Sequence, residues 1–168
     1  MFRDAAAALG HPTAFHPHAG TFIETPAEID RLVTSTDPAR VGICLDVGHH
    51  IVGGGEPVAD LRMLGARVTH LHLKDVDPGV LGDLRAGRFS GVGEAVQNGL
   101  FTELGAGMLD LDGVIGVLVE RDYDGWLMVE QDHGFGPPSE SAAIGRRMLG
   151  AALRRLGGRS TTVQAVTR

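Results

Sequence analysis

The chain has one cysteine, a deficit of positive charge and no long apolar run, and each shortage narrows what the protein can be. Cys44 is the only cysteine among 168 residues, so an internal disulfide is impossible. Lysine and arginine number 15 against 21 acidic residues, for a net charge of -6, whereas nucleic-acid binding generally needs a basic face. No segment approaches the roughly 18 apolar residues of a membrane span, and residues 1–9 lack the apolar core of a secretory signal. We therefore expect a cytoplasmic protein that binds neither nucleic acid nor membrane.

Four short apolar segments, each ending in polar side chains, are the main positive signal. Each is bounded by Gly, Pro or Asp and is typical of a buried parallel strand. The segments cover residues 13–18, 41–46, 68–75 and 126–132.

Helical patterns separate these segments. Thr25 can cap a helix that begins at Pro26, Glu28 completes a capping box, and the helix should end before residue 37. Residues 53–55 are expected to form a flexible glycine loop, and a long loop should follow residue 75. The remaining helices are expected around residues 57–64, 111–120 and 140–156.

The alternation of strands and helices predicts an α/β fold with parallel strands and crossover helices. A closed barrel of this kind needs eight strands and roughly 250 residues, so four units predict the C-terminal half of a (β/α)8 TIM barrel. Residues 1–157 would form one partial domain, with residues 2–9 ending the preceding helix, and residues 158–168 a disordered tail. A half barrel has two open sheet edges; we expect either a homo-oligomer formed through them or an incomplete gene product.

Each of the four segments ends in residue types that can bind metals. In a barrel this end of the strands faces the active site. A mixed set of imidazoles and carboxylates favours a divalent metal with an open coordination position. Mn²⁺ or Co²⁺ is the first expectation, with Zn²⁺ or Fe²⁺ as alternatives. The candidate ligands are His16 or His18, Asp46, His72 and Glu130.

Several of these residues also have structural interpretations. Asp46 could cap a helix or form an Asx turn. Strand alternation places His70, His72 and Lys74 on one face, where His70 could be an ordinary core residue. His49 could be a further ligand or contact the substrate.

Other residues of the same types are expected to carry no chemistry. Cys44 should be a buried and inert thiol. His11, His50 and His133 are expected at the surface.

The chain resembles the xylose isomerase-like barrel superfamily, and within it the myo-inosose-2 dehydratases. The resemblance rests on Phe15-His-Pro-His-Ala-Gly-Thr21, Thr25-Pro-Ala-Glu-Ile-Asp-Arg-Leu32, Leu45-Asp-Val-Gly-His49, His70-Leu-His-Leu-Lys-Asp75, Val96-Gln-Asn-Gly-Leu-Phe-Thr102, Gly105-Ala-Gly-Met-Leu-Asp110 and Tyr123-Asp-Gly-Trp-Leu-Met-Val-Glu-Gln-Asp132. It implies metal ligands at His16 or His18, Asp46, His72 and Glu130. Family members are nearly twice as long.

The resemblance implies a lyase that removes water from 2-keto-myo-inositol in inositol catabolism. Glu130, Lys74 and His18 are the candidates for acid and base, with the roles open among them, and His18, His49 and Lys74 would contact a small polyol or ketose. A sugar isomerase or epimerase of the same superfamily and an inactive truncated barrel are the alternatives. A DNA-repair endonuclease of the superfamily would need a basic groove, which the acidic balance argues against.

Overall fold

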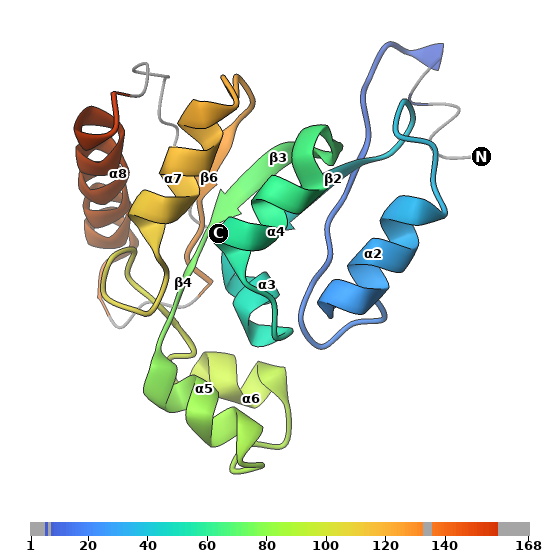
Figure 1. Cartoon of the computed structure of the whole chain (residues 1–168). Helices are drawn as coiled ribbons and strands as arrows, with labels where there is room; N and C mark the ends of the chain where they lie inside the picture. Colours follow the sequence, from blue (N-terminus) through green and yellow to red (C-terminus); the bar gives the residue numbers. More distant parts are fainter. Residues whose placement is uncertain (1–5, 7, 133–135, 158–168) are drawn as a thin grey trace.

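Four parallel strands form the central sheet of the computed structural model, which describes residue 6, residues 8–132 and residues 136–157 (Figure 1). The order in the sheet is β1-β2-β3-β6, and every neighbouring pair is parallel. The strands are β1 Ala14–Phe15, β2 Gly42–Asp46, β3 Val68–Leu73 and β6 Leu127–Val129. The prediction of an α/β fold with four parallel strands is therefore confirmed, and all four strands end at the same edge of the sheet.

Helices follow the strands and pack in a layer against the sheet. α4 contacts α7, and α7 contacts α8, so these three helices lie side by side (Figure 1). The helices are α2 Pro26–Thr34, α3 Val47–Val52, α4 Pro57–Leu64, the 3-10 turn η1 Gly65–Arg67, α5 Pro78–Arg85, α6 Val92–Gln97, α7 Leu111–Glu120 and α8 Pro138–Arg155. None of the helices within these described residues is long and apolar enough to span a membrane.

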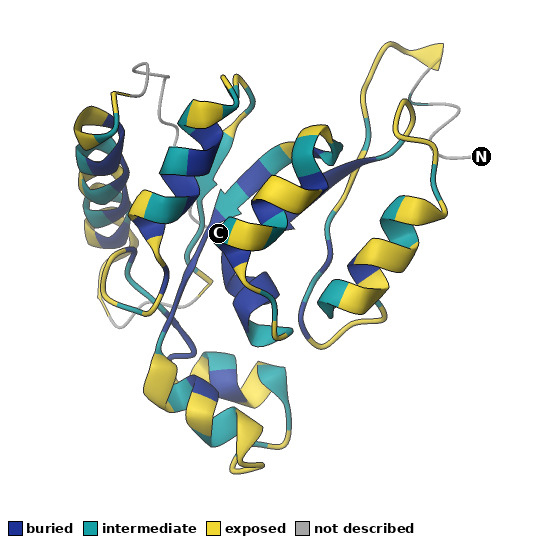
Figure 2. Cartoon of the chain, in the orientation of Figure 1, coloured by how far each residue is buried: buried dark blue, intermediate teal, exposed yellow. Residues whose placement is uncertain are grey.

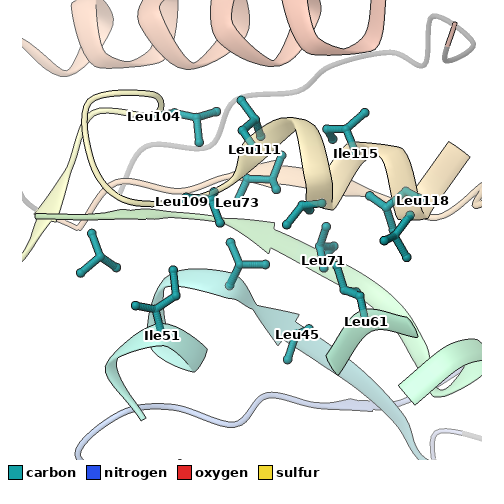
Figure 3. Packing of buried hydrophobic residues seen from close by; sticks show 14 of the residues in the cluster. Leu45, Ile51, Leu61, Leu71, Leu73, Leu104, Leu109, Leu111, Ile115 and Leu118 are labelled. Atoms are coloured by element: carbon teal, nitrogen blue, oxygen red, sulfur yellow. The ribbon is translucent and has the colours of Figure 1, made fainter. Parts of the chain in front are cut away.

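Strand alternation divides β2 and β3 into an apolar face and a polar face. Leu45, Leu71 and Leu73 are at most 1% exposed and pack with Leu61 and Ile115 of the helical layer (Figure 3). The residues between them along both strands project to the opposite face, which is the face that would line a barrel. The hydrophobic core therefore fixes which side of the sheet carries the polar residues.

Burial falls from the central strands to the two edge strands (Figure 2). All five residues of β2 are buried, whereas both residues of β1 are exposed and those of β6 are only half-buried. The expectation of four equally buried strands was therefore wrong for β1 and β6. Each of them pairs with one neighbour in this sheet, so one side of each strand stays open.

The expected loop after residue 75 is an ordered excursion with its own small sheet. β4 Asp75–Val76 pairs antiparallel with β5 Phe101–Thr102, and α5 and α6 lie between them (Figure 1). Asp77 caps α5 by accepting hydrogen bonds from the backbone of Gly79 and Val80, and Pro78 follows at its first position. The sequence therefore contained a start signal for α5. The helix was not predicted because so short a segment has too few apolar positions to show helical periodicity.

Helix boundaries elsewhere agree closely with the sequence. The capping box of Thr25 and Glu28 is formed, and α2 ends at Thr34. α3 was not predicted, although a helix cap was one of the two structural interpretations of Asp46 and is the one the structure shows. Residues 158–168, His133 and most of residues 2–9 lie outside the described residues, so the predictions made for them stay predictions.

Candidate metal centre

Asp46 lies at the point where β2 becomes α3 and uses its two carboxylate oxygens differently. Oδ1 accepts hydrogen bonds from the backbone N–H of Gly48 and His49, at 2.9 and 3.0 Å, and so caps α3. Oδ2 has no hydrogen-bond partner among the described residues, although the side chain is fully buried. The capping role and the site role are thus compatible, because one oxygen serves each.

His72 and Glu130 approach the free oxygen of Asp46 from the next two strands. His72 Nδ1 lies 2.6 Å from Glu130 Oε2 and 3.7 Å from Asp46 Oδ2. Asp46 and His72 are opposite each other in the register of β2 and β3, and Glu130 directly follows β6. Parallel pairing therefore brings three candidate ligands from three strand ends together.

The structure favours His16 over His18 as the fourth member of this group. His16 Nε2 lies 3.9 Å from Asp46 Oδ2, and the His16 and His72 ring centroids are 5.0 Å apart. His18 instead hydrogen-bonds through Nδ1 to the carbonyl of Ala19 at 2.9 Å. We refer to His16, Asp46, His72 and Glu130 as the rim site.

Lys74 is a buried cation directly beside the rim site. Its Nζ donates to Asp132 Oδ2 at 2.9 Å and lies 3.4 Å from Asp46 Oδ2 and 3.7 Å from Glu130 Oε1. The same Nζ is 3.2 Å from Nε2 of His49. A side chain that is 1% exposed is thus surrounded by three carboxylates and an imidazole.

Gly48 explains how α3 can pass so close to Lys74. A Cβ atom at Gly48 would lie 2.8 Å from both Cβ and Cγ of Lys74 and 2.9 Å from its carbonyl oxygen. Real Cβ atoms do not approach other atoms so closely, so any larger residue would displace α3. The glycine of the Asp-Val-Gly-His motif therefore makes room for the lysine.

Burial and opposing charges set the ionisation of the site. Burial alone would lower the pKa of His72, but contacts with Asp46, Cys44 and Glu130 raise it to about 11. The contact with His72 lowers the pKa of Glu130 to about 2. Burial would raise the pKa of Asp46, yet His72 and Lys74 hold it well below its usual range. A cation that binds at His72 must therefore displace a proton from an imidazolium.

Burial and neighbouring charges also shift the pKa values of three further groups. Burial lowers the pKa of Lys74, but Asp46 and Asp132 outweigh it, so the pKa is raised and the ammonium persists. Burial lowers the pKa of His49 to about 3, so this imidazole is neutral beside the ammonium. Burial also lowers the pKa of His16, against the attraction of Asp46.

His49, a predicted substrate contact, is 2% exposed and packs against other side chains. Its ring lies 3.5 Å from the His18 ring, centroid to centroid, and 4.8 Å from that of Phe101. Its Nε2 lies 3.2 Å from Lys74 Nζ. These contacts of the His49 ring are with protein side chains, and its role as a substrate contact stays a prediction.

His50 was expected at the surface, and this expectation was wrong. It is 3% exposed, and its Nε2 lies 2.6 Å from Asp60 Oδ2. His50 lies in α3, a helix absent from the sequence prediction, and α3 turns it toward α4. His11, by contrast, is exposed as predicted.

Two acidic residues that sequence reasoning passed over make close contacts in the structure, one beside the rim site and one in the segment that follows β3. Asp132 forms the shortest contact with Lys74. Asp75 is buried and accepts backbone hydrogen bonds from Val76, Gly105, Gly107 and Leu109, at 2.8–3.1 Å. Asp75 and Asp132 are the last residues of two segments that the sequence predicts as strands. This position was the available signal.

The rim site offers a donor set that could hold a divalent cation. One ligand atom from each of His16, Asp46 and His72 lies within 4.8 Å of the other two. His16 Nε2, Asp46 Oδ2 and His72 Nδ1 are buried without hydrogen-bond partners among the described residues. His72 Nδ1 and Glu130 Oε2 are close enough to form an ion pair, but their relative orientation is not that of a hydrogen bond. Buried polar atoms in native structures are rarely left unpaired, and a cation would satisfy all three.

The parallel sheet and the rim site together are those of half an α/β barrel, with a candidate metal centre at the C-terminal edge of its strands. Residues 3–152 match the family model described as Xylose isomerase-like TIM barrel. The chain therefore belongs to the xylose isomerase-like TIM barrel family.

Curated relatives include several inosose dehydratases. The inosose dehydratase of Lacticaseibacillus casei is 36% identical over 152 residues, which are 89% of this chain and 51% of that protein. The inosose dehydratase of Clostridium botulinum (strain Alaska E43 / Type E3) is 36% identical over 146 residues, which are 86% of this chain and 49% of that protein. The chain spans about half the length of the curated relatives it matches.

Solved structures show the same fold at lower identity. A xylose isomerase domain protein from Planctomyces limnophilus superposes with a TM-score of 0.69 at 19% identity, covering 93% of this chain and 51% of that one. The probable 3-DHS dehydratase AsbF from Bacillus anthracis superposes with a TM-score of 0.62 at 19% identity, covering 95% and 55%. At this identity the likeness concerns the fold.

Proposed function

We propose that this chain is the metal-binding half of a dehydratase that removes water from 2-keto-myo-inositol in inositol catabolism, with Mn²⁺ or Co²⁺ at the rim site. The observation that carries the proposal is the convergence of unpaired ligand atoms from His16, Asp46 and His72 beside Glu130. The inosose dehydratases that match 80–89% of this chain support the substrate class.

The rim residues would hold the cation through two imidazoles and two carboxylates. When bound, the ion supplies Lewis acidity to a ketone oxygen, which makes a hydrogen on the adjacent carbon more acidic. Glu130 and Asp46 are ionised at neutral pH, as ligands must be. In this arrangement Glu130 is a ligand and is less available as a proton-transfer group.

His18 is the base that the hydrogen bonds favour. A carbonyl oxygen can only accept, so Nδ1 of His18 must carry the proton that is donated to Ala19. In the neutral ring Nε2 is then the unprotonated nitrogen. We assign to this atom the removal of the proton next to the ketone.

Lys74 is the matching acid. Its raised pKa keeps Nζ protonated, and Asp132 and His49 hold it beside Asp46. The ammonium can donate a proton to the departing β-hydroxyl, which leaves as water while a carbon–carbon double bond forms. His18 gains a proton and Lys74 loses one, so the exchange balances over the turnover.

The complete active site requires four more strands under this proposal. They would come from the remainder of a longer protein or from a second copy of the chain across the open edges of β1 and β6. Molar mass in solution separates these cases, because self-completion predicts a dimer and a strict monomer contradicts it.

Product mass tests the proposed reaction. The chain, reloaded with Mn²⁺, is incubated with 2-keto-myo-inositol alone and with a separately produced N-terminal half of a matching inosose dehydratase. A product lighter by one water supports the dehydratase, provided that it is lost in His18→Gln. A product of unchanged mass would instead support an isomerase or epimerase, and no turnover in either mixture would contradict the proposal.

A further inference from the structure

A second group of metal-type ligands lies one step down the same face of the sheet. Cys44 and His70 are opposite each other in the register of β2 and β3, two residues before Asp46 and His72. Ligand atoms of Cys44, His70 and His72 lie within 4.8 Å of one another. The two imidazole rings of β3 are 5.3 Å apart, centroid to centroid.

The chemistry of this group differs from that of the rim site. Cys44 contributes a thiol that is 7% exposed and belongs to no disulfide. One thiolate with two imidazoles is a borderline-soft set that suits Zn²⁺ and Co²⁺, whereas carboxylates suit harder ions. His70 is only half-buried, so the fourth coordination position could be filled from solvent.

We infer that Cys44, His70 and His72 form a second cation site of the Zn²⁺ and Co²⁺ type, here called the thiolate site, which shares His72 with the rim site. The two ring nitrogens of an imidazole are separate ligands on different edges of the ring. Nδ1 of His72 lies 2.6 Å from Glu130 Oε2 of the rim site, which leaves Nε2 for the thiolate site. Binding there would release the thiol proton, and occupation of both sites would also displace both ring protons of His72, which would then bridge the two ions as an imidazolate.

Ligand atoms around a tetrahedral Zn²⁺ lie roughly 3.3–3.8 Å apart, given Zn–N and Zn–S bonds of about 2.1 and 2.3 Å. Separations within 4.8 Å are compatible with such a site, and side-chain rotation on fixed strands can bring the atoms to bonding distance. Ion binding at the thiolate site would also fix the ring of His72, and with it one ligand of the rim site. This coupling goes beyond the proposed dehydratase function and does not depend on it.

Cobalt titration of the metal-stripped full chain tests the inference. Co²⁺ bound to a thiolate gives a near-ultraviolet charge-transfer band, and Cys44 is the only possible source of one in this chain. We expect the band in the wild type, together with protection of Cys44 from alkylation by iodoacetamide. Cys44→Ser should abolish the band and lower cobalt content from about two ions per chain to about one.

Asp46→Asn is the matched control for the rim site. It should lower cobalt content to about one ion per chain while the thiolate band persists. A wild type with one cobalt ion, no band and unprotected Cys44 would overturn the thiolate site and leave the rim site intact. The band with one ion per chain, unchanged in Asp46→Asn, would support the thiolate site and contradict the rim site instead.

Discussion

Asp46 and Asp75 are both 1% exposed, and they lie at or just after the ends of the neighbouring strands β2 and β3, yet they make opposite kinds of contact. Both carboxylate oxygens of Asp75 accept hydrogen bonds, from four backbone N–H groups in all. Three of these groups belong to the segment 105–109. Asp46 uses one oxygen for a helix cap, and its other oxygen has basic neighbours in His16, His72 and Lys74 but no hydrogen bond among the described residues. Burial and position therefore do not identify a functional carboxylate, whereas its hydrogen bonds do.

The largest effect is expected at Asp75. Asp75→Ala leaves several buried N–H groups without an acceptor, at about 1–3 kcal/mol for each such group, so the free energy of unfolding should fall by roughly 3–5 kcal/mol. Urea denaturation measures this loss. A loss below about 1 kcal/mol would mean that the segment 105–109 holds its position without Asp75.

Asp46→Asn should separate binding from stability. The amide oxygen can still accept from Gly48 and His49, so the free energy of unfolding without metal should change by less than about 1 kcal/mol. The affinity for Mn²⁺ should fall at least 100-fold, or about 2.7 kcal/mol, since even indirect contacts to a metal are worth roughly 10–100-fold. Calorimetric titration measures the affinity, and equal affinities in variant and wild type would assign Asp46 to the same structural class as Asp75.

Lys74→Met sharpens the electrostatic side of the comparison. Lys74 Nζ is a cation 3.4 Å from the free oxygen of Asp46 and competes with any metal ion for its charge. Its removal should raise Mn²⁺ affinity about tenfold, or about 1.4 kcal/mol, while dehydration stops because the proton donor is gone. Lys74→Arg is the control that keeps the charge, and weaker Mn²⁺ binding in Lys74→Met would refute the competition.

The smallest effect is expected at Thr25, whose side chain caps α2 at an exposed position. Thr25→Ala should lower the free energy of unfolding by about 1 kcal/mol and leave Mn²⁺ affinity unchanged. This value provides the scale for the capping oxygen of Asp46. Thermal and urea denaturation measure this loss of stability. A loss as large as that of Asp75→Ala would contradict the claim that the number of buried hydrogen bonds sets the size of the effect.

The sequence was a good guide to the parallel strands because buried β2 and β3 are dominated by apolar periodicity. It was a poor guide to α3, α5 and α6, which are short and depend on caps such as Asp46 and Asp77. Strand alternation grouped His70, His72 and Lys74 correctly on one face. The sequence showed which strand ends carry candidate ligands. The choice between His16 and His18 depends on local backbone geometry after β1.

The double use of Asp46, the burial of His50 and the importance of Asp132 required the fold. Each depends on a partner distant in sequence or on a helix that the pattern did not predict. Asp132 reaches Lys74 across 58 positions, so no local pattern could have paired them. Sequence patterns thus indicated the edge of the sheet that carries the candidate site, and three-dimensional contacts distinguished the candidate ligands from the residues around them.

The most direct test of the rim site is Mn²⁺ binding, followed by the electron paramagnetic resonance signal of the free ion. Mn²⁺ prefers oxygen and imidazole ligands to thiolate, so it reports on the rim site rather than on Cys44. We predict about one tightly bound Mn²⁺ per wild-type chain and loss of that binding in both Asp46→Asn and His72→Ala. Undiminished Mn²⁺ binding in both variants, or none in the folded wild type, would contradict the account.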